Sequence, residues 1–98
     1  MRILAIEREL PGITSEQFNP YLKTEAIKVW ELLQAGILRE IYFDQNKRSA
    51  VLMLECSDTE QANQVLKTLP LVKENLIGFD IIPLVPYPGF ARLFAKDP

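Results

Sequence analysis

The chain has 98 residues, which is room for one small domain. It contains no histidine and a single cysteine, Cys56, so histidine-based nucleophile and metal sites and an intrachain disulfide are excluded within one copy. Eleven basic residues stand against thirteen acidic ones, and the basic residues are scattered. We therefore expect a soluble cytoplasmic protein that has no metal or cofactor and binds neither nucleic acid nor membrane.

The first elements expected are a strand and a helix. Residues 1–7 form a short apolar run typical of a buried strand, and a turn of helix is expected over 15–18. The main helix is predicted to start with Asn19 as its N-cap and Pro20 at its first position, and to stop at Gly36. Its apolar residues recur at helical spacing and form one stripe: Leu22, Ala26, Val29, Trp30 and Leu33.

Two β-rich runs, 37–43 and 49–55, follow with turn-forming residues between them and predict a hairpin. A four-residue turn pairs Phe43 with Arg48, and a five-residue turn pairs Phe43 with Ser49. The first register puts Glu40 and Tyr42 on the sheet face of Met53 and Glu55, and the second brings Arg39 near Glu55. The sequence leaves both registers open.

The last third predicts a second helix, a last strand and an arm. Asp58, with Gln61 three residues on, is a typical helix start, and Pro70 is expected to end that helix. Residues 76–84 form the last strand, where Pro83 fits only an edge strand or a strand end. We expect the Pro- and aromatic-rich segment 85–98 to serve as a C-terminal oligomerisation arm, anchored by aromatic side chains: Tyr87, Phe90 and Phe94.

The resulting order is β-α-β-β-α-β, which predicts a single α+β domain with the ferredoxin-like fold over 1–98. Right-handed crossovers place the first and third strands in the centre of a four-stranded antiparallel sheet. Two helices cover only one face of such a sheet. Because both faces carry apolar residues, we expect a second copy of the chain to cover the other face.

Three short motifs together resemble the muconolactone delta-isomerase family. They are Gly-Ile-Leu-Arg at 36–39, Thr-Leu-Pro-Leu at 68–71 and Phe-Asp-Ile-Ile-Pro-Leu at 79–84, with Pro88 beyond them. The resemblance implies a dimeric α/β barrel, larger assemblies, and a pocket between sheet and helices. Known members shift a proton within a small unsaturated lactone without a cofactor. This chain departs from them in lacking histidine and in carrying Tyr42 and Phe43 after the arginine strand.

Proton transfer without a cofactor needs a carboxylate in an apolar pocket and a group that stabilises the resulting oxyanion. The candidate bases are Glu25, which also aligns with an acidic helix position of the family, Glu40 and Glu55. Arg39 and Tyr42 are the candidates for oxyanion stabilisation. Structural roles compete with these: an Arg39–Glu55 ion pair, a Glu25–Lys28 helix pair, and charge on an exposed edge strand for Glu40 and Tyr42.

Trp30, Met53 and Phe79 are the candidate ligand-binding side chains, although Trp30 suits the core equally well. The leading hypothesis is a small-molecule-binding, isomerase-like homo-oligomer. A non-catalytic binding or assembly module and a cofactor-free monooxygenase remain alternatives, so the sequence leaves open whether the chain is an enzyme. An open pocket above ~300 Å³ lined by a carboxylate favours the enzyme, and a filled one favours the module.

Two further side chains have structural interpretations. Cys56 has no cation near it in the sequence, which predicts a buried, unreactive thiol. Asp80 lies between apolar residues on the last strand, where we expect it to pair with a basic group of a partner subunit.

Overall fold

The computed structural model describes residues 1–96 and has the ferredoxin-like fold expected from the sequence. Its strands are β1 (Arg2–Glu9), β2 (Leu38–Phe43), β3 (Ala50–Glu55) and β4 (Ile77–Pro83). Its α-helices are α1 (Leu22–Gln34), α2 (Thr59–Leu66) and α3 (Pro70–Lys73), and the 3₁₀ helices are η1 (Ser15–Tyr21) and η2 (Pro88–Leu93).

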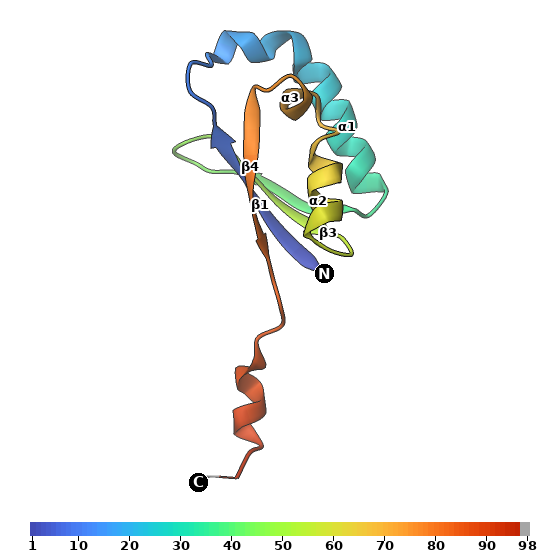
Figure 1. Ribbon diagram of the computed structural model, residues 1–98, viewed down its shortest axis with the longest axis vertical. Coiled ribbons are helices and arrows are strands. Elements are labelled where there is room, and N and C mark those ends of the chain that lie inside the picture. The colour runs from blue at the N-terminus through green and yellow to red at the C-terminus, as the bar shows by residue number, and fades with distance from the viewer. Residues whose placement is uncertain (97–98) are drawn as a thin grey trace.

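The four strands form one antiparallel sheet in the order β2-β3-β1-β4, with β1 and β3 in the centre. Figure 1 shows α1, α2 and α3 on one side of this sheet. The predicted fold class and strand order are therefore confirmed. No helix in the part of the chain that the structure describes is long and apolar enough to cross a membrane.

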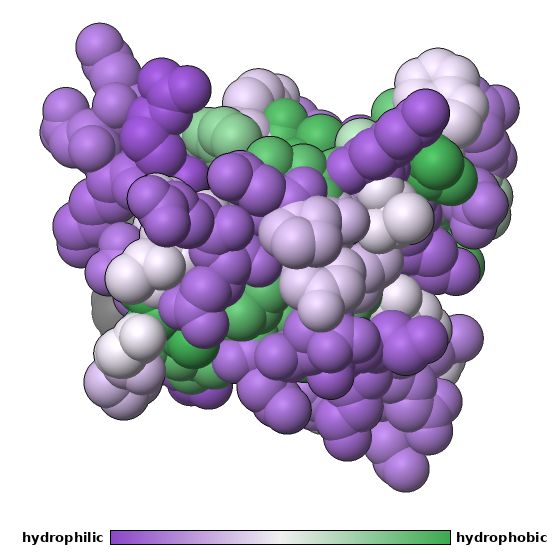
Figure 2. Space-filling view, turned by 90° about the horizontal axis from the view of Figure 1, so that it is seen from above, coloured by the Kyte–Doolittle hydropathy of each residue, from purple (hydrophilic) through white to green (hydrophobic). Residues whose placement is uncertain are grey.

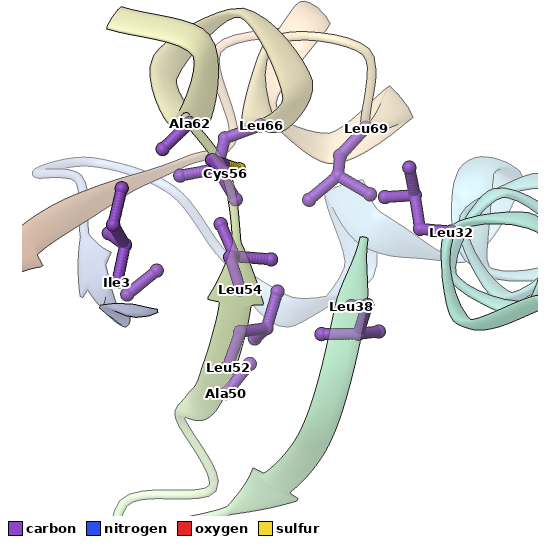
Figure 3. Packing of buried hydrophobic residues seen from close by; sticks show 11 residues of the cluster. Ile3, Leu32, Leu38, Ala50, Leu52, Leu54, Cys56, Ala62, Leu66 and Leu69 are labelled. Atoms are coloured by element: carbon purple, nitrogen blue, oxygen red, sulfur yellow. The ribbon is translucent and has the colours of Figure 1, made fainter. Parts of the chain in front are cut away.

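The core lies between the sheet and α2, and Figure 3 shows its side chains converging from both layers. Ile3 and Ala5 of β1 and Leu52 and Leu54 of β3 point toward the helices because they alternate along their strands. From α2, Ala62 and Leu66 meet them. Asp58 caps this helix as predicted, since its side chain accepts a hydrogen bond from the Gln61 amide at 2.8 Å.

The start of α1 differs from the prediction. The helix begins at Leu22 after the η1 turn, and Pro20 lies inside η1 rather than at the first position of α1. Two residues of the expected α-helix therefore take the tighter 3₁₀ geometry. The stop at Gly36 is as expected, because this glycine has a φ of 77°, in the left-handed region that favours glycine.

The hairpin loop is longer than the loop in either predicted register. Phe43 pairs with Ala50, so residues 44–49 form the loop, and the predicted partners Arg48 and Ser49 are both wrong. The Asp44 carboxylate explains the length, since it accepts hydrogen bonds from the amides of Asn46 and Lys47 and stabilises a wider turn. A six-residue loop keeps the side-chain parity of a four-residue loop. Tyr42 therefore faces Val51, on the side of the sheet away from the helices.

The segment after α2 forms the short helix α3, where the sequence indicated only the end of the preceding helix. Pro70 takes the first position of α3, where its missing N–H is not needed. β4 begins one residue later than expected and ends at Pro83, on the edge of the sheet, as the proline requires.

Beyond β4 the chain leaves the body of the molecule (Figure 1). The radius of gyration is 16.7 Å, against about 13 Å for a compact chain of this length. The segment contains η2, and at its start the rings of Tyr87 and Phe90 pack edge to face with their centroids 5.0 Å apart. Phe94 is 87% exposed. Residues 97–98 of the expected arm lie outside the described residues.

The sheet face away from the helices carries a half-exposed apolar patch, which we call the bare face. Leu4, Ile6, Val51, Met53 and Ile82 form it, and the strand register places them next to one another. Two ion pairs lie at its margins. Arg8 Nη1 donates to Asp80 Oδ1 at 2.8 Å, and Arg2 Nε lies 3.3 Å from Glu55 Oε1.

Candidate functional site

A cavity of about 420 Å³ lies between α1 and the helix-covered face of the sheet. The whole predicted apolar stripe of α1 lines it, from Leu22 to Leu33. Figure 2 shows hydrophobic surface recessed among hydrophilic residues at the end of the molecule seen from above Figure 1. Among the fifteen lining residues only Glu7 and Glu25 are charged, and the others are apolar. The predicted helix stripe therefore faces an open cavity rather than a filled core. We call this space the main cavity.

Glu25 comes from the first turn of α1, one position away from the apolar stripe. Its Oε1 accepts a hydrogen bond from the Leu71 amide at 2.9 Å. That amide is free because Leu71 follows Pro70 at the start of α3, where backbone N–H groups have no partner within the helix. Burial raises the pKa of Glu25; the Leu71 hydrogen bond partly opposes this, and the charge of Glu7 raises it further. The expected pairing of Glu25 with Lys28 is absent, because Lys28 contacts Glu31 at 3.7 Å.

Glu7 is the functional candidate that the sequence analysis missed. It lies on β1 on the same face as Ile3 and Ala5, and its Oε1 accepts a hydrogen bond from the Ala50 amide at 2.9 Å. The β1–β3 ladder ends at Ile6, so the side chain of Glu7 binds the next amide of β3. Period-two counting from the buried Ile3 would have placed Glu7 toward the helices, and this was the available signal.

A second cavity of about 440 Å³ adjoins the main cavity and shares Glu7, Leu22 and Phe43 with it. Its lining is more polar and includes Lys47 and Arg48 from the hairpin loop. Positive charge thus lies on the side of the second cavity. The main cavity has no cation among its lining residues.

Three of the predicted catalytic side chains lie outside the main cavity, on β2. Tyr42 donates a hydrogen bond to Glu40 Oε1 at 3.0 Å, and both side chains are exposed on the bare side of the sheet. This bond and the charge of Glu40 raise the pKa of Tyr42. Arg39 lies at a β-bulge and donates through Nε to the Gly36 carbonyl at 2.8 Å. The structure therefore separates this group from Glu25.

Glu55 lies on the bare side as well. Its Oε2 accepts a hydrogen bond from the Met1 ammonium group at 2.6 Å, and Arg2 is its second ionic partner. The bond to the ammonium group, with the charges of Arg2 and Arg39, lowers the pKa of Glu55. The expected Arg39–Glu55 ion pair is replaced by these contacts.

The predicted ligand-binding residues are divided between the two faces. Trp30 and Phe79 line the main cavity, and Trp30 is 59% exposed, so it lies at the cavity rather than in the core. Met53 points to the bare face, opposite Leu4 and Glu40. Asp80 pairs with Arg8 of the same copy.

The thiol of Cys56 is buried, and burial raises its pKa. The predicted burial is confirmed, and the raised pKa disfavours the nucleophilic thiolate.

Comparison with known proteins identifies the fold. One solved structure, described as the crystal structure of muconolactone isomerase, aligns with 90% of this chain and 92% of its own chain, at a TM-score of 0.73 and 16% sequence identity. The two proteins share one fold. The likeness in sequence is too low to carry function from one to the other. No protein-family model and no curated protein sequence matches the chain.

Proposed function

We propose that this protein binds a small unsaturated or aromatic-derived molecule in the main cavity and moves a proton within it, as a cofactor-independent, muconolactone isomerase-like enzyme. The observation that carries this proposal is the pairing of an open, apolar cavity of about 420 Å³ with the half-buried carboxylate of Glu25. The volume exceeds the ~300 Å³ that separates a ligand cavity from a filled core.

The chemistry follows from the environment of Glu25. A carboxylate in water is too weak a base to take a proton from carbon at useful rates, but partial burial raises its pKa toward the working pH. Apolar walls, with Trp30 and Phe79 among them, suit a flat unsaturated ring. The name of the structural neighbour supports a lactone as the first substrate to test.

We also propose that the working form is a homodimer or a larger homo-oligomer. The bare face exposes neighbouring apolar side chains with ion pairs at its margins, and this is the composition of a protein–protein interface. The arm adds apolar side chains that the rest of its own copy leaves exposed, such as Leu93 and Phe94. Burying each against a neighbouring copy would contribute about 1.5–3 kcal/mol.

The test uses muconolactone and related small unsaturated lactones, with calorimetry for binding and proton NMR for isomerisation. Glu25→Gln should reduce turnover by about 10²–10⁴-fold while ligand still binds, because the amide keeps the shape but cannot take a proton. Glu31→Gln, on the same helix and outside the cavity lining, is the matched control and should turn over like the wild type. Full activity in Glu25→Gln contradicts the proposal.

A non-catalytic binding module is the second candidate, and one observation favours it. Neither the cation nor the hydroxyl group expected to stabilise an oxyanion lines the main cavity, since Arg39 and Tyr42 lie elsewhere. Binding without isomerisation of any lactone tested would select this function. Of the aromatic residues that would support a monooxygenase, only Trp30 lines the main cavity, and no tyrosine is among its lining residues.

A further inference from the structure

The main cavity holds two carboxylates and no positive charge among the described residues that line it. Glu7 belongs to β1 and Glu25 to α1, so the two side chains come from opposite layers. Each has one oxygen bound to a backbone amide, that of Ala50 for Glu7 and that of Leu71 for Glu25. The second oxygen of each carboxylate takes part in no hydrogen bond within residues 1–96 and is free for a ligand.

This arrangement constrains how an oxyanion is stabilised. Taking a proton from the carbon next to a carbonyl places negative charge on the carbonyl oxygen. In an apolar cavity that charge is costly unless a cation or a proton donor meets it. Since no cation lines the cavity, the remaining donor is a carboxylic acid, that is, one of the two glutamates in its protonated form.

The surroundings distinguish the two glutamates. Burial and the charge of Glu7 raise the pKa of Glu25, which favours the protonated acid there. Glu7 also lines the second cavity, whose lining includes the positively charged Lys47 and Arg48. Glu9, from the same strand, is the other acid of that cavity. Because the charge of Glu7 acts on Glu25, the two carboxylates are electrostatically coupled.

We propose that Glu7 and Glu25 act as one acid–base pair, with Glu7 as the base and Glu25 as the acid, on neutral carbonyl compounds that carry a removable C–H. This inference rests on the proposed function and adds Glu7 as a second catalytic residue. It moves the role of base from Glu25, where the proposed function places it, to Glu7, and it assigns to Glu25 the proton-donor role in the step that forms the enol.

The step balances without a co-reactant. The Glu7 carboxylate takes the proton from carbon, the C–H electron pair becomes the new C=C bond of the enol, and Glu25 gives its proton to the carbonyl oxygen. In the second half, Glu7 returns its proton to the far end of the conjugated system, the enol O–H proton goes back to Glu25, and the carbonyl re-forms. The net result is a shifted double bond, with both carboxyl groups restored.

The first test needs no substrate. Carbon-13 NMR of the glutamate carboxyl groups follows the titration of Glu25 in wild type, Glu7→Gln and Glu31→Gln. The glutamine in Glu7→Gln keeps an oxygen for the Ala50 amide, so the fold is maintained. We expect the titration midpoint of Glu25 to move to lower pH in Glu7→Gln and to stay unchanged in Glu31→Gln. An unchanged midpoint in Glu7→Gln overturns the pair.

The second test uses turnover of the unsaturated lactone. Glu7→Gln and Glu25→Gln should each lose at least a hundredfold in rate, and the double variant should lose little more, because the two groups act as a unit. A Glu7→Gln variant with the wild-type rate overturns the pair but leaves the proposed function standing. If wild type turns over no lactone, the proposed function fails, and the titration midpoint alone decides whether the two glutamates are coupled.

Discussion

The two faces of the sheet differ in the partners of their carboxylates. On the bare side, Glu40 has the Tyr42 hydroxyl, Glu55 has Arg2 and the terminal ammonium group, and Asp80 has Arg8. On the helix-covered side, the two glutamates of the main cavity accept hydrogen bonds only from backbone amides. Carboxylates that are paired and hydrated are poorly suited to proton transfer, whereas carboxylates in an apolar cavity are well suited to it. We therefore propose that the helix-covered face carries the chemistry and that the bare face serves assembly.

The largest effect is expected on assembly, at the centre of the bare face. Met53→Glu would place a charge in the interface twice, once in each copy, beside Glu40 and Glu55. At about 2 kcal/mol for each copy, the dimer dissociation constant should rise about a thousandfold. Analytical ultracentrifugation measures it, with Gln64→Glu on the exposed surface of α2 as control. Equal masses for both variants at every concentration would rule out this interface.

The next effect concerns the covered face. Ala26→Phe should fill part of the main cavity and weaken lactone binding about a hundredfold, because apolar contacts with the ligand are replaced by the ring. Calorimetry measures the affinity, and a thermal melt checks the fold. Gln34→Phe, at the exposed end of α1, carries the same ring outside the cavity and should bind as the wild type does. Unchanged affinity in Ala26→Phe would place the ligand elsewhere.

A smaller effect is expected from the arm. Phe94→Ala removes a ring that is 87% exposed in the single copy, so the stability of an isolated copy should change little. If the ring packs on a neighbour, the assembly should weaken about tenfold or more. Light scattering over a dilution series measures this. The same dissociation curve for variant and wild type would show that the ring makes no contact between copies.

The smallest effect is a contrast in pH dependence between the faces. Glu25, with its raised pKa, destabilises the fold increasingly as the pH rises above its ordinary value of 4.5. Glu55, with its lowered pKa, stabilises the fold above 4.5 and stops doing so as the pH falls through its folded value. Glu25→Gln should therefore raise Tm at pH 8 and Glu55→Gln should lower it, each by a few degrees at most. The Glu25 difference should vanish below pH 4.5 and the Glu55 difference as the pH falls through the lowered pKa of that group. Shifts of the same sign would contradict this contrast.

The sequence predicted the fold well because period and element order are properties of the whole chain. Helical periodicity predicted the apolar stripe of α1 that contains Val29 and Trp30. The alternation of Ile3 and Ala5 marks the buried face of β1. Helical spacing also put Glu25 at the edge of the stripe, where the structure has it at the cavity.

Features set by single local contacts were harder to predict. The hairpin length depends on the Asp44 side chain, which binds two amides of the loop, and no periodicity reports such a contact. The start of α1 depends on the 3₁₀ turn around Pro20. Glu7 was missed because a carboxylate inside an apolar strand is satisfied by the Ala50 amide of another strand, a partner 43 residues away in sequence. Glu40 and Tyr42 were candidates because they lie two residues apart on one strand, but their side chains are on the face of the sheet away from the cavity.

NMR titration of the backbone amides with an unsaturated lactone tests the division of roles between the faces most directly. The amides of Ala50 and Leu71 bind the two cavity glutamates. Tyr42 and Met53, by contrast, are strand residues whose side chains lie on the bare side of the sheet. We expect the signals of Ala50 and Leu71 to move on ligand addition while those of Tyr42 and Met53 stay in place. Movement confined to Tyr42 and Met53 would contradict the account.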